Sequence, residues 1–355
     1  MRTRLTTALL LGTGMLAGST RTSAQSAILN LPRVSQHSRL TQRVGLTDIT
    51  IDYHRPSVAG RKIFGGLQAW GDVWRAGANE NTTFEVTDPV TIDGQLLPKG
   101  VYGLHMIPGE ASWVVIFSRN STSWGSFTYD KSEDALRVTV KPQTSENHEQ
   151  LSYDFDDLTP STARITMRWE KVAVPFTLKV NTADIAQLSL RNQLRSRAQF
   201  EWSPWMEAAN YMLANKLSAD EALKDADRSV EIEDRFENEI TRSRALTVLG
   251  RTDQALAARN RAITLGTQSQ VHDFCRGLQA QGRQEEALAL FRVNIQKDPT
   301  SWIGHNDAAR VAVAAGDFDK AVKEMELAVP KATETLKPQI VDLIRRLKNK
   351  EDINK

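Results

Sequence analysis

The chain has 355 residues, of which 40% are hydrophobic and 25% are charged. This composition excludes a disordered or fibrous protein and allows two domains with cores of their own. The formal net charge is only +2, and because affinity for nucleic acid rests on neutralising phosphates, the balance argues against a nucleic-acid partner.

The N-terminus reads as a leader for export. Two arginines precede an apolar stretch at residues 5–17, and Thr-Ser-Ala at 22–24 supplies small side chains of the kind that a signal peptidase accepts. We therefore expect a signal peptide over residues 1–24 and a periplasmic or secreted mature protein. The stretch is shorter than the roughly 20 apolar residues of a membrane span, so we expect no membrane insertion after cleavage.

Cleavage after Ala24 changes the charge balance. It removes three arginines, which takes Lys and Arg from 45 to 42 against 43 Asp and Glu, so the formal charge becomes −1. The mildly basic character of the chain therefore belongs to the leader.

Residues 25–181 are expected to form a β-rich domain. Short runs of alternating apolar residues recur between turn signals, with no helical pattern between them. About eight such runs predict an antiparallel β-sandwich or a jelly-roll-like barrel. The clearest hairpin joins 90–92 to 95–97 through Asp93-Gly94. The other predicted strands are 49–53, 83–86, 101–107, 113–117, 136–140, 163–169 and 172–180.

Several segments of this domain do not read as plain strands, and they hold most of its His, Trp and Gly. The segments lie at 32–37, 45–48, 53–56 (Tyr-His-Arg-Pro), 60–65 (Gly-Arg-Lys-Ile-Phe-Gly), 73–80 (Val-Trp-Arg-Ala-Gly-Ala-Asn-Glu), 103–108 and 121–125 (Ser-Thr-Ser-Trp-Gly). On these stretches the chain, over roughly residues 31–180, resembles DUF2911, an exported bacterial family defined as a domain of unknown function. The resemblance implies an exported location and helical repeats after the domain, and it supplies no established activity or catalytic residue.

From about residue 182 the pattern changes to Ala-, Leu-, Glu- and Arg-rich segments with apolar residues every three or four positions, which predicts a helical domain over 182–355. Aligning this half with itself places Ala222, Ala255, Ala287 and Ala321 at spacings of 33, 32 and 34 residues, and the last three follow a glycine by five positions. Such a period is typical of helix-turn-helix repeats, and the pattern resembles the tetratricopeptide (TPR) family. We expect an α-helical TPR-like solenoid of four hairpins over about 204–329, with a helix near 183–199 before it and a capping helix near 337–348.

Repeat arrays expose a concave surface that usually binds a protein or peptide. The alternative is that these hairpins form a scaffold packed on the first domain. Cys275 is the only cysteine, which excludes an intrachain disulfide, and its place beside Phe274 on a repeat helix favours a packing role.

The unusual segments of the first domain could line a pocket on one of its faces. Tryptophan offers a flat platform for a sugar or an aromatic ring, while Arg and Asn orient a ligand through directional donors. The candidate ligand-binding residues are His37, His54, Arg55, Lys62, Trp74, Arg75, Asn79, Glu80, His105 and Trp124. The competing interpretation places the tryptophans in the core and pairs Arg75 with Glu80.

Catalytic and metal-binding motifs are not evident in the sequence. Three of the histidines and Glu80 are suitable ligand types, yet no His-x-His, His-Glu-x-x-His or paired-cysteine spacing occurs, so we expect no metal and no cofactor. A Gly-x-Ser-x-Gly elbow and a phosphate loop are missing as well. Catalytic residues therefore stay unassigned.

Three classes of function stay open. The first is a non-enzymatic binding protein whose β domain holds a small molecule or glycan and whose repeats contact a protein or the β domain. The second is a structural or assembly factor of the cell envelope. The third is an enzyme of unfamiliar type, for example a hydrolase, that uses the His, Arg and Trp loops.

Overall fold

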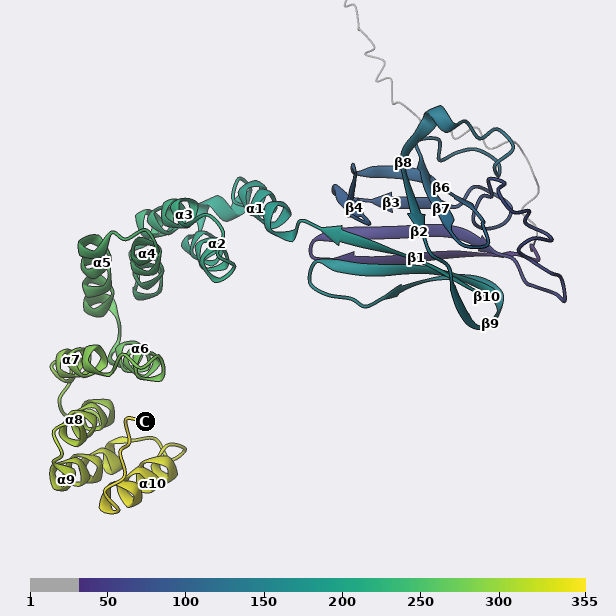
Figure 1. Ribbon diagram of the computed structural model, residues 1–355. Helices are drawn as coiled ribbons and strands as arrows, with labels where there is room; N and C mark the ends of the chain where they lie inside the picture. The colour runs from purple at the N-terminus through teal and green to yellow at the C-terminus, as the bar shows by residue number, and fades with distance from the viewer. Residues whose placement is uncertain (1–31) are drawn as a thin grey trace, which may run out of the picture.

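The computed structural model describes residues 32–355, and the predicted leader at 1–24 lies outside the described residues. A β-rich domain comes first and an array of helices follows it (Figure 1). No helix in the described part is long and apolar enough to cross a membrane.

The strands form two antiparallel sheets that share one core. The sheet of six has the order β1 (Gln36–Val44), β2 (Thr47–Arg55), β3 (Thr83–Val86), β6 (Gly100–Ile107), β7 (Trp113–Ser118) and β8 (Asp134–Val140). The sheet of four has the order β5 (Gln95–Leu97), β4 (Val90–Ile92), β10 (Thr162–Val180) and β9 (Gln143–Asp156). Phe117 of the first sheet lies edge-to-face on Phe176 of the second, with ring centroids 5.9 Å apart. The predicted antiparallel sandwich is confirmed.

Two strands, β1 and β9, were not among the predicted ones. Each lies at an edge of its sheet and is rich in polar residues, so it lacks the apolar alternation that predicts a half-buried strand. The predicted strands 163–169 and 172–180 are instead one strand, β10. Its register against β9 shifts around Glu170, which has a φ of +55°, so the sequence break corresponds to a bulge within a continuous strand.

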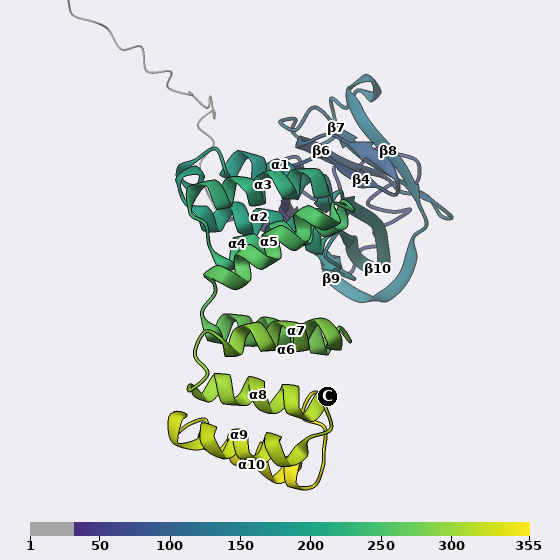
Figure 2. The same cartoon turned by 90° about the vertical axis from the view of Figure 1, so that its left-hand side faces the viewer.

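The helical half consists of antiparallel hairpins stacked into a bent array (Figure 2). Each hairpin is an adjacent pair of helices: α2 (Trp202–Ala214) with α3 (Ala219–Ile232), α4 (Phe236–Val248) with α5 (Thr252–Leu265), α6 (Gln268–Ala280) with α7 (Gln284–Ile295), and α8 (Trp302–Ala314) with α9 (Phe318–Ala328). The helices α4 and α6 lie on one side of the array, and α5 and α7 lie on the other (Figure 1). The predicted solenoid is confirmed.

The repeat residues explain the stacking. The four alanines at 222, 255, 287 and 321 lie in the first turn of the second helix of each hairpin. They are at most 6% exposed, which lets neighbouring helices approach closely. Gly250, Gly282 and Gly316 turn the chain with φ of +72°, +77° and +78°. In the first hairpin Lys216 takes this role, with a φ of +54°.

Two further helices flank the hairpins. The helix α1 (Thr182–Gln193) ends six residues before the predicted limit of 199, and a 3-10 turn over Arg197–Phe200 leads into α2. The helix α10 (Lys337–Lys348) occupies the predicted range and covers the end of the array.

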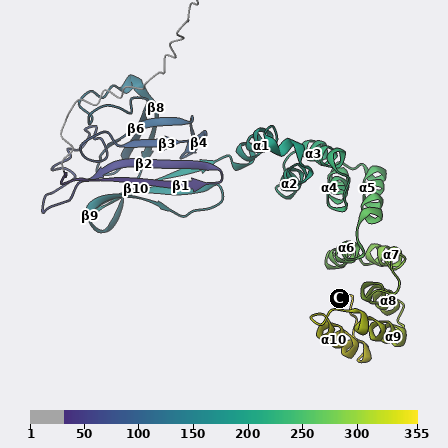
Figure 3. The ribbon, with the colours of Figure 1, turned by 180° about the vertical axis from the view of Figure 1, so that it is seen from behind.

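The β domain joins the array without a loop (Figure 3). The strand β10 ends at Val180, the Asn181 side chain caps α1 by accepting from the Asp184 amide, and α1 begins at Thr182. Ile185 of this helix packs against the core of the β domain. The Thr182 hydroxyl also donates to the Pro160 carbonyl at 3.2 Å.

Candidate functional site

A cleft of about 550 Å³ opens on the β domain. The segment between β2 and β3 supplies most of its walls, the β7–β8 connection supplies Ser126 and Phe127, and β10 supplies Trp169. Trp74 and Trp169 stack with ring centroids 5.7 Å apart and planes 22° from parallel. Trp74 is 5% exposed and Trp169 is 1% exposed, so both indoles belong to the core of the domain and form the base of the cleft.

Two arginines, Arg61 and Arg75, line the cleft, and each donates to backbone carbonyls. The Arg61 guanidinium donates to Val58 at 3.0 Å and to Ser57 at 2.5 Å. The Arg75 guanidinium donates to the carbonyl of Asn79 and lies 5.6 Å from the Phe127 ring. No Asp or Glu lines this cleft within the described part of the chain, so the lining has an excess of positive charge.

The Arg75 guanidinium packs closely against Gly125. A Cβ added at Gly125 would lie 2.8 Å from its Nη1, and Gly125 has a φ of +67°, so a side chain there would push the guanidinium away. Burial lowers the pKa of Arg75, and the charge of Glu80 partly opposes this shift. A half-buried cation of this kind gains from an anionic partner.

The loop after Trp74 has strained backbone. Ala76 has a φ of +50° and Asn79 one of +58°, values that L-residues adopt at a cost. The loop is anchored to β6, because the backbone N–H and C=O of Trp74 both form hydrogen bonds with Met106 at 2.8 Å. The Trp74 indole also donates to Gly77 at 3.1 Å. Backbone strain held by such anchors is common at ligand sites.

A group of charged side chains adjoins the cleft. His37 and His54 are opposite one another on β1 and β2, with ring centroids 5.2 Å apart. His54 Nε2 lies 3.4 Å from Glu80, which accepts from Arg33 at 2.5 and 2.6 Å. Burial lowers the pKa of His54, while the charge of Glu80 opposes that shift. Glu80 therefore pairs with Arg33. The Arg75–Glu80 pair of the competing interpretation is not formed, since Arg75 donates its hydrogen bond to the Asn79 carbonyl.

The structure divides the predicted site residues. Trp74, Arg75 and Asn79 line the cleft, while His37, His54 and Glu80 form the adjoining charged group. Trp124 is half-exposed, with the Arg33 guanidinium 6.0 Å from its ring.

The other three predicted residues lie elsewhere. The Arg55 guanidinium donates to the Leu151 carbonyl of β9 at 2.9 Å, which ties the two sheets together. Lys62 is exposed and is not part of the lining. His105 is buried on β6 and bonds through Nδ1 to Ser126 Oγ at 2.8 Å.

His105 predicts a pH dependence of stability. Burial lowers its pKa to about 4 from an ordinary value of 6.5. The unfolded chain therefore takes up this proton first, so the contribution is fully present above pH 6.5 and is lost as the pH falls towards 4. We expect wild-type protein to lose about 2–3 kcal/mol more stability than His105→Gln between pH 7.5 and 4.5. Urea unfolding followed by tryptophan fluorescence measures this, and equal pH slopes would contradict it.

Arg61, Gln68, Phe127 and Trp169 line the cleft but were not predicted. Arg61 lies within the Gly-Arg-Lys-Ile-Phe-Gly motif, which could have indicated it. Phe127 and Trp169 belong to distant segments, and nothing in the sequence places them beside Trp74. No group of three or more His, Cys, Asp or Glu side chains in the described residues could hold a metal ion.

A second cleft, of about 730 Å³, lies between the hairpins α4–α5 and α6–α7. Its lining is mainly apolar and includes Val248, Leu256 and Phe274. Arg244, Arg259 and Arg283 also line it, and Glu286 pairs with both Arg259 and Arg283. This lining therefore also has an excess of positive charge.

Residues 35–178 match the family model described as "Protein of unknown function (DUF2911)". The match spans 144 of the 355 residues and lies within the β domain. The DUF2911 match covers both sheets and the cleft, and the TPR-like repeats follow it. No curated protein matches the chain.

Solved structures similar to this chain include three helical-repeat proteins or complexes. MamA is 17% identical, with a TM-score of 0.30, and the match covers 44% of this chain and 92% of MamA. YrrB, titled a TPR protein with an unusual peptide-binding site, is 17% identical at a TM-score of 0.27, covering 46% and 84%. The APC/C Cut9-Hcn1 complex is 20% identical at 0.29, covering 46% and 33%.

Proposed function

We propose that this is an exported binding protein whose DUF2911 domain holds a small organic anion, such as an aromatic acid or an acidic sugar, and whose repeats contact another protein. The cleft of the DUF2911 domain carries this proposal. It combines a base of two stacked, mostly buried indoles and the exposed ring of Phe127 with two guanidinium groups, and no carboxylate lines it among residues 32–355. Aromatic faces accept a ring, and guanidinium groups bind carboxylates or sulfates.

An unpaired donor supports a polar ligand. Trp169 lines the cleft, and its indole Nε1 is buried without an acceptor among the described residues. Buried donors of this kind usually have a partner, because leaving one unpaired is costly. Because Nε1 is out of reach of solvent in this conformation, a ligand oxygen would pair with it after a small turn of the Trp169 ring towards the cleft.

The size of the cleft also fits. Pockets for small organic ligands enclose about 300–1,000 Å³, and this cleft encloses about 550 Å³. A monosaccharide or a single aromatic acid has room beside Trp74.

The roles of the repeats and of export rest on other observations. The apolar cleft between α4–α5 and α6–α7 offers a protein-binding surface of the kind that helical arrays commonly use. Export to the periplasm or outside the cell rests on the leader motif at residues 1–24.

Tryptophan fluorescence titration tests the cleft, because Trp74 and Trp169 form its wall. The probes are phenylacetate and galacturonate, each compared with a neutral counterpart, phenylacetamide and galactose. We expect an acid to bind and Arg75→Gln to weaken that binding by at least about tenfold, as for a lost charged hydrogen bond.

Arg43→Gln is the matched control. Arg43 pairs with Asp48 at the other end of β1, at 2.7 Å, and does not line the cleft, so this variant should bind as wild type does. Binding of the neutral probes as tightly as the acids, or an unchanged affinity in Arg75→Gln with a native melting curve, would overturn the proposal.

A further inference from the structure

The segment after α10 returns to the array and is buried in it. The chain reverses at Lys350, with a φ of +56°, and the Glu351 amide donates back to Arg346 at 3.0 Å. Ile353 is 2% exposed within the core formed by α8, α9 and α10, and Asn354 is 6% exposed. Figures 1 and 2 show this end of the chain beside α8. We refer to residues 351–354 as the tail segment.

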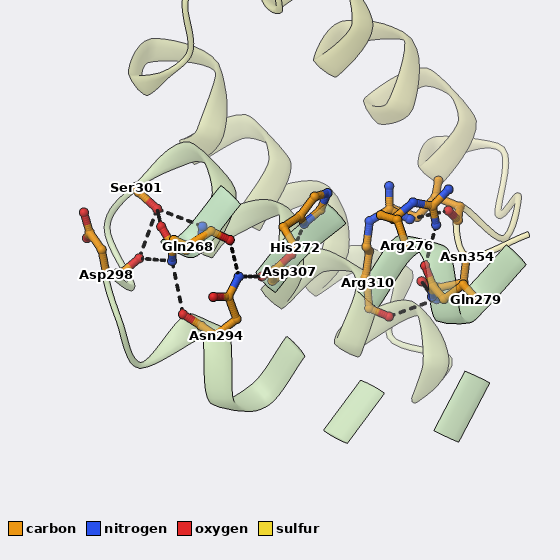
Figure 4. A network of polar contacts seen from close by, with 12 residues as sticks. Gln268, His272, Arg276, Gln279, Asn294, Asp298, Ser301, Asp307, Arg310 and Asn354 are labelled. Atoms are coloured by element: carbon orange, nitrogen blue, oxygen red, sulfur yellow. Dashed lines mark hydrogen bonds and ion pairs between the residues drawn. The ribbon is translucent and has the colours of Figure 1, made fainter. Parts of the chain in front are cut away.

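The array holds the tail segment through contacts to its backbone and its side chains, and the segment ends in a turn in which the Asn354 N–H donates to Asp352 at 2.9 Å. Arg310 of α8 donates through Nη1 to the Ile353 carbonyl at 2.6 Å. The Asn354 amide bridges two repeats, donating to the Arg310 carbonyl at 3.0 Å and accepting from Gln279 of α6 at 2.9 Å (Figure 4). These contacts recognise the main-chain carbonyl of Ile353, the amide side chain of Asn354 and the aliphatic side chain of Ile353.

The recess under the tail segment has more positive charge than its contacts neutralise. Arg310 is 5% exposed, its Nε has no partner among the described residues, and its one hydrogen bond goes to a neutral carbonyl. Burial, and then the neighbouring charge of Arg276, lower the pKa of Arg310 to about 9, and Arg346 acts in the same direction. The charge of Asp307 opposes this lowering of the pKa, but its carboxylate is already bonded to His272 and Asn294. A carboxylate in this recess would therefore be favoured.

The tail segment supplies acids to this recess. Glu351 pairs with Arg346 at 3.2 Å, and the charge of Asp352 favours the protonated form of Arg310. The sequence Glu-Asp-Ile-Asn thus matches the recess in charge, in its aliphatic side chain and in its amide.

We propose that the recess between α6, α8 and α10 is a binding site for a short acidic segment of another protein, and that residues 351–354 occupy it as a displaceable internal ligand. This deepens, and rests on, the proposed protein-binding role of the repeats. The tail segment then lowers the affinity for an outside peptide by the fraction of molecules in which it is seated.

The test uses the full chain and a fluorescein-labelled peptide with the sequence of residues 351–354, which carries the two acids without the flanking lysines. Ile353→Asp places a charge in the apolar seat and releases the tail segment. We expect fluorescence anisotropy to show the peptide binding Ile353→Asp at least about tenfold more tightly than wild type. The gain should disappear in Ile353→Asp/Arg310→Met, and a peptide with Gln and Asn in place of its Glu and Asp should bind more weakly.

Val341→Asp is the control, because Val341 is 55% exposed on α10 and takes no part in the tail contacts. It should bind the peptide no better than wild type. If Ile353→Asp keeps its helical circular dichroism and binds no better than Val341→Asp, the tail segment is a fixed cap and the proposal fails.

If Ile353→Asp does not fold, hydrogen exchange of the wild-type protein provides a second test. Excess unlabelled peptide added to wild-type protein should speed hydrogen exchange of the amides at 351–354, and unchanged exchange would overturn the proposal. If a protein partner binds the repeats and Arg310→Met does not change its affinity, the proposed role of the repeats stands. The proposed site between α6, α8 and α10 is then wrong. Ligand binding in the DUF2911 cleft is scored separately by tryptophan fluorescence.

Discussion

Replacing Phe64 with alanine is expected to destabilise the β domain by about 3–5 kcal/mol, the usual cost of removing a large aromatic side chain from a core. Phe64 is 4% exposed and lies at the centre of an aromatic group. Its ring centroid is 4.8 Å from that of Trp113, 6.0 Å from those of Trp74 and Trp169, and 6.4 Å from that of Trp70. The neighbouring indole rings cannot close the space without losing their own contacts. Urea unfolding followed by tryptophan fluorescence measures the change.

Phe127→Ala is the control for this substitution. Phe127 is 81% exposed at the mouth of the cleft, and a surface change of this kind usually alters stability by less than about 0.5 kcal/mol. Phe64→Leu should recover part of the loss, because it restores much of the volume. A Phe64→Ala variant as stable as Phe127→Ala would show that the aromatic group is not packed as described.

The second large effect is expected at Asp307, a fully buried carboxylate of α8. It pairs with His272 Nδ1 of α6 and accepts from Asn294 of α7 at 2.7 Å, so one side chain joins three helices of two hairpins (Figure 4). Removing one partner of such a buried network leaves polar groups without water or protein contacts. We expect Asp307→Ala to lower the stability of the array by about 3–5 kcal/mol, as measured by urea unfolding followed at 222 nm.

Asp342→Ala tests whether the loss of stability in Asp307→Ala comes from the burial of the Asp307 carboxylate. Asp342 pairs with Arg345 at 2.6 Å on the exposed face of α10, and surface pairs contribute between 0 and about 1 kcal/mol. Asp307→Asn retains one oxygen and should fall between the two alanine variants. Equal stabilities for Asp307→Ala and Asp342→Ala would contradict the prediction.

The helical half was predictable because its information is local and periodic. Each hairpin repeats a turn followed by a small alanine, and the helix α10 begins and ends where the apolar spacing predicted. The hairpin at Asp93-Gly94 was predictable for a similar reason, since both residues have the positive φ that its tight turn requires. The strands β1 and β9 were not, because edge strands with polar faces lack the alternation that marks a strand.

The cleft was only partly predictable. Trp74, Arg75 and Asn79 come from one unusual loop, so the sequence itself groups them. Phe127 and Trp169 reach the same cleft from segments far along the chain, and only the packing of the two sheets brings them there. Burial of Ile353 likewise has no sequence signal, because a single aliphatic residue in a polar segment has no period.

The joint between β10 and α1 bears on how the whole molecule moves. A strand that runs directly into a capped helix provides no slack, and Ile185 anchors the first turn of that helix in the sandwich core. Swinging one half against the other would require breaking the cap at Asn181 and exposing an apolar side chain to water. The strand β10 therefore fixes the orientation of the helical array relative to the sandwich. A protein bound by the repeats would lie at a defined angle to the cleft of the β domain.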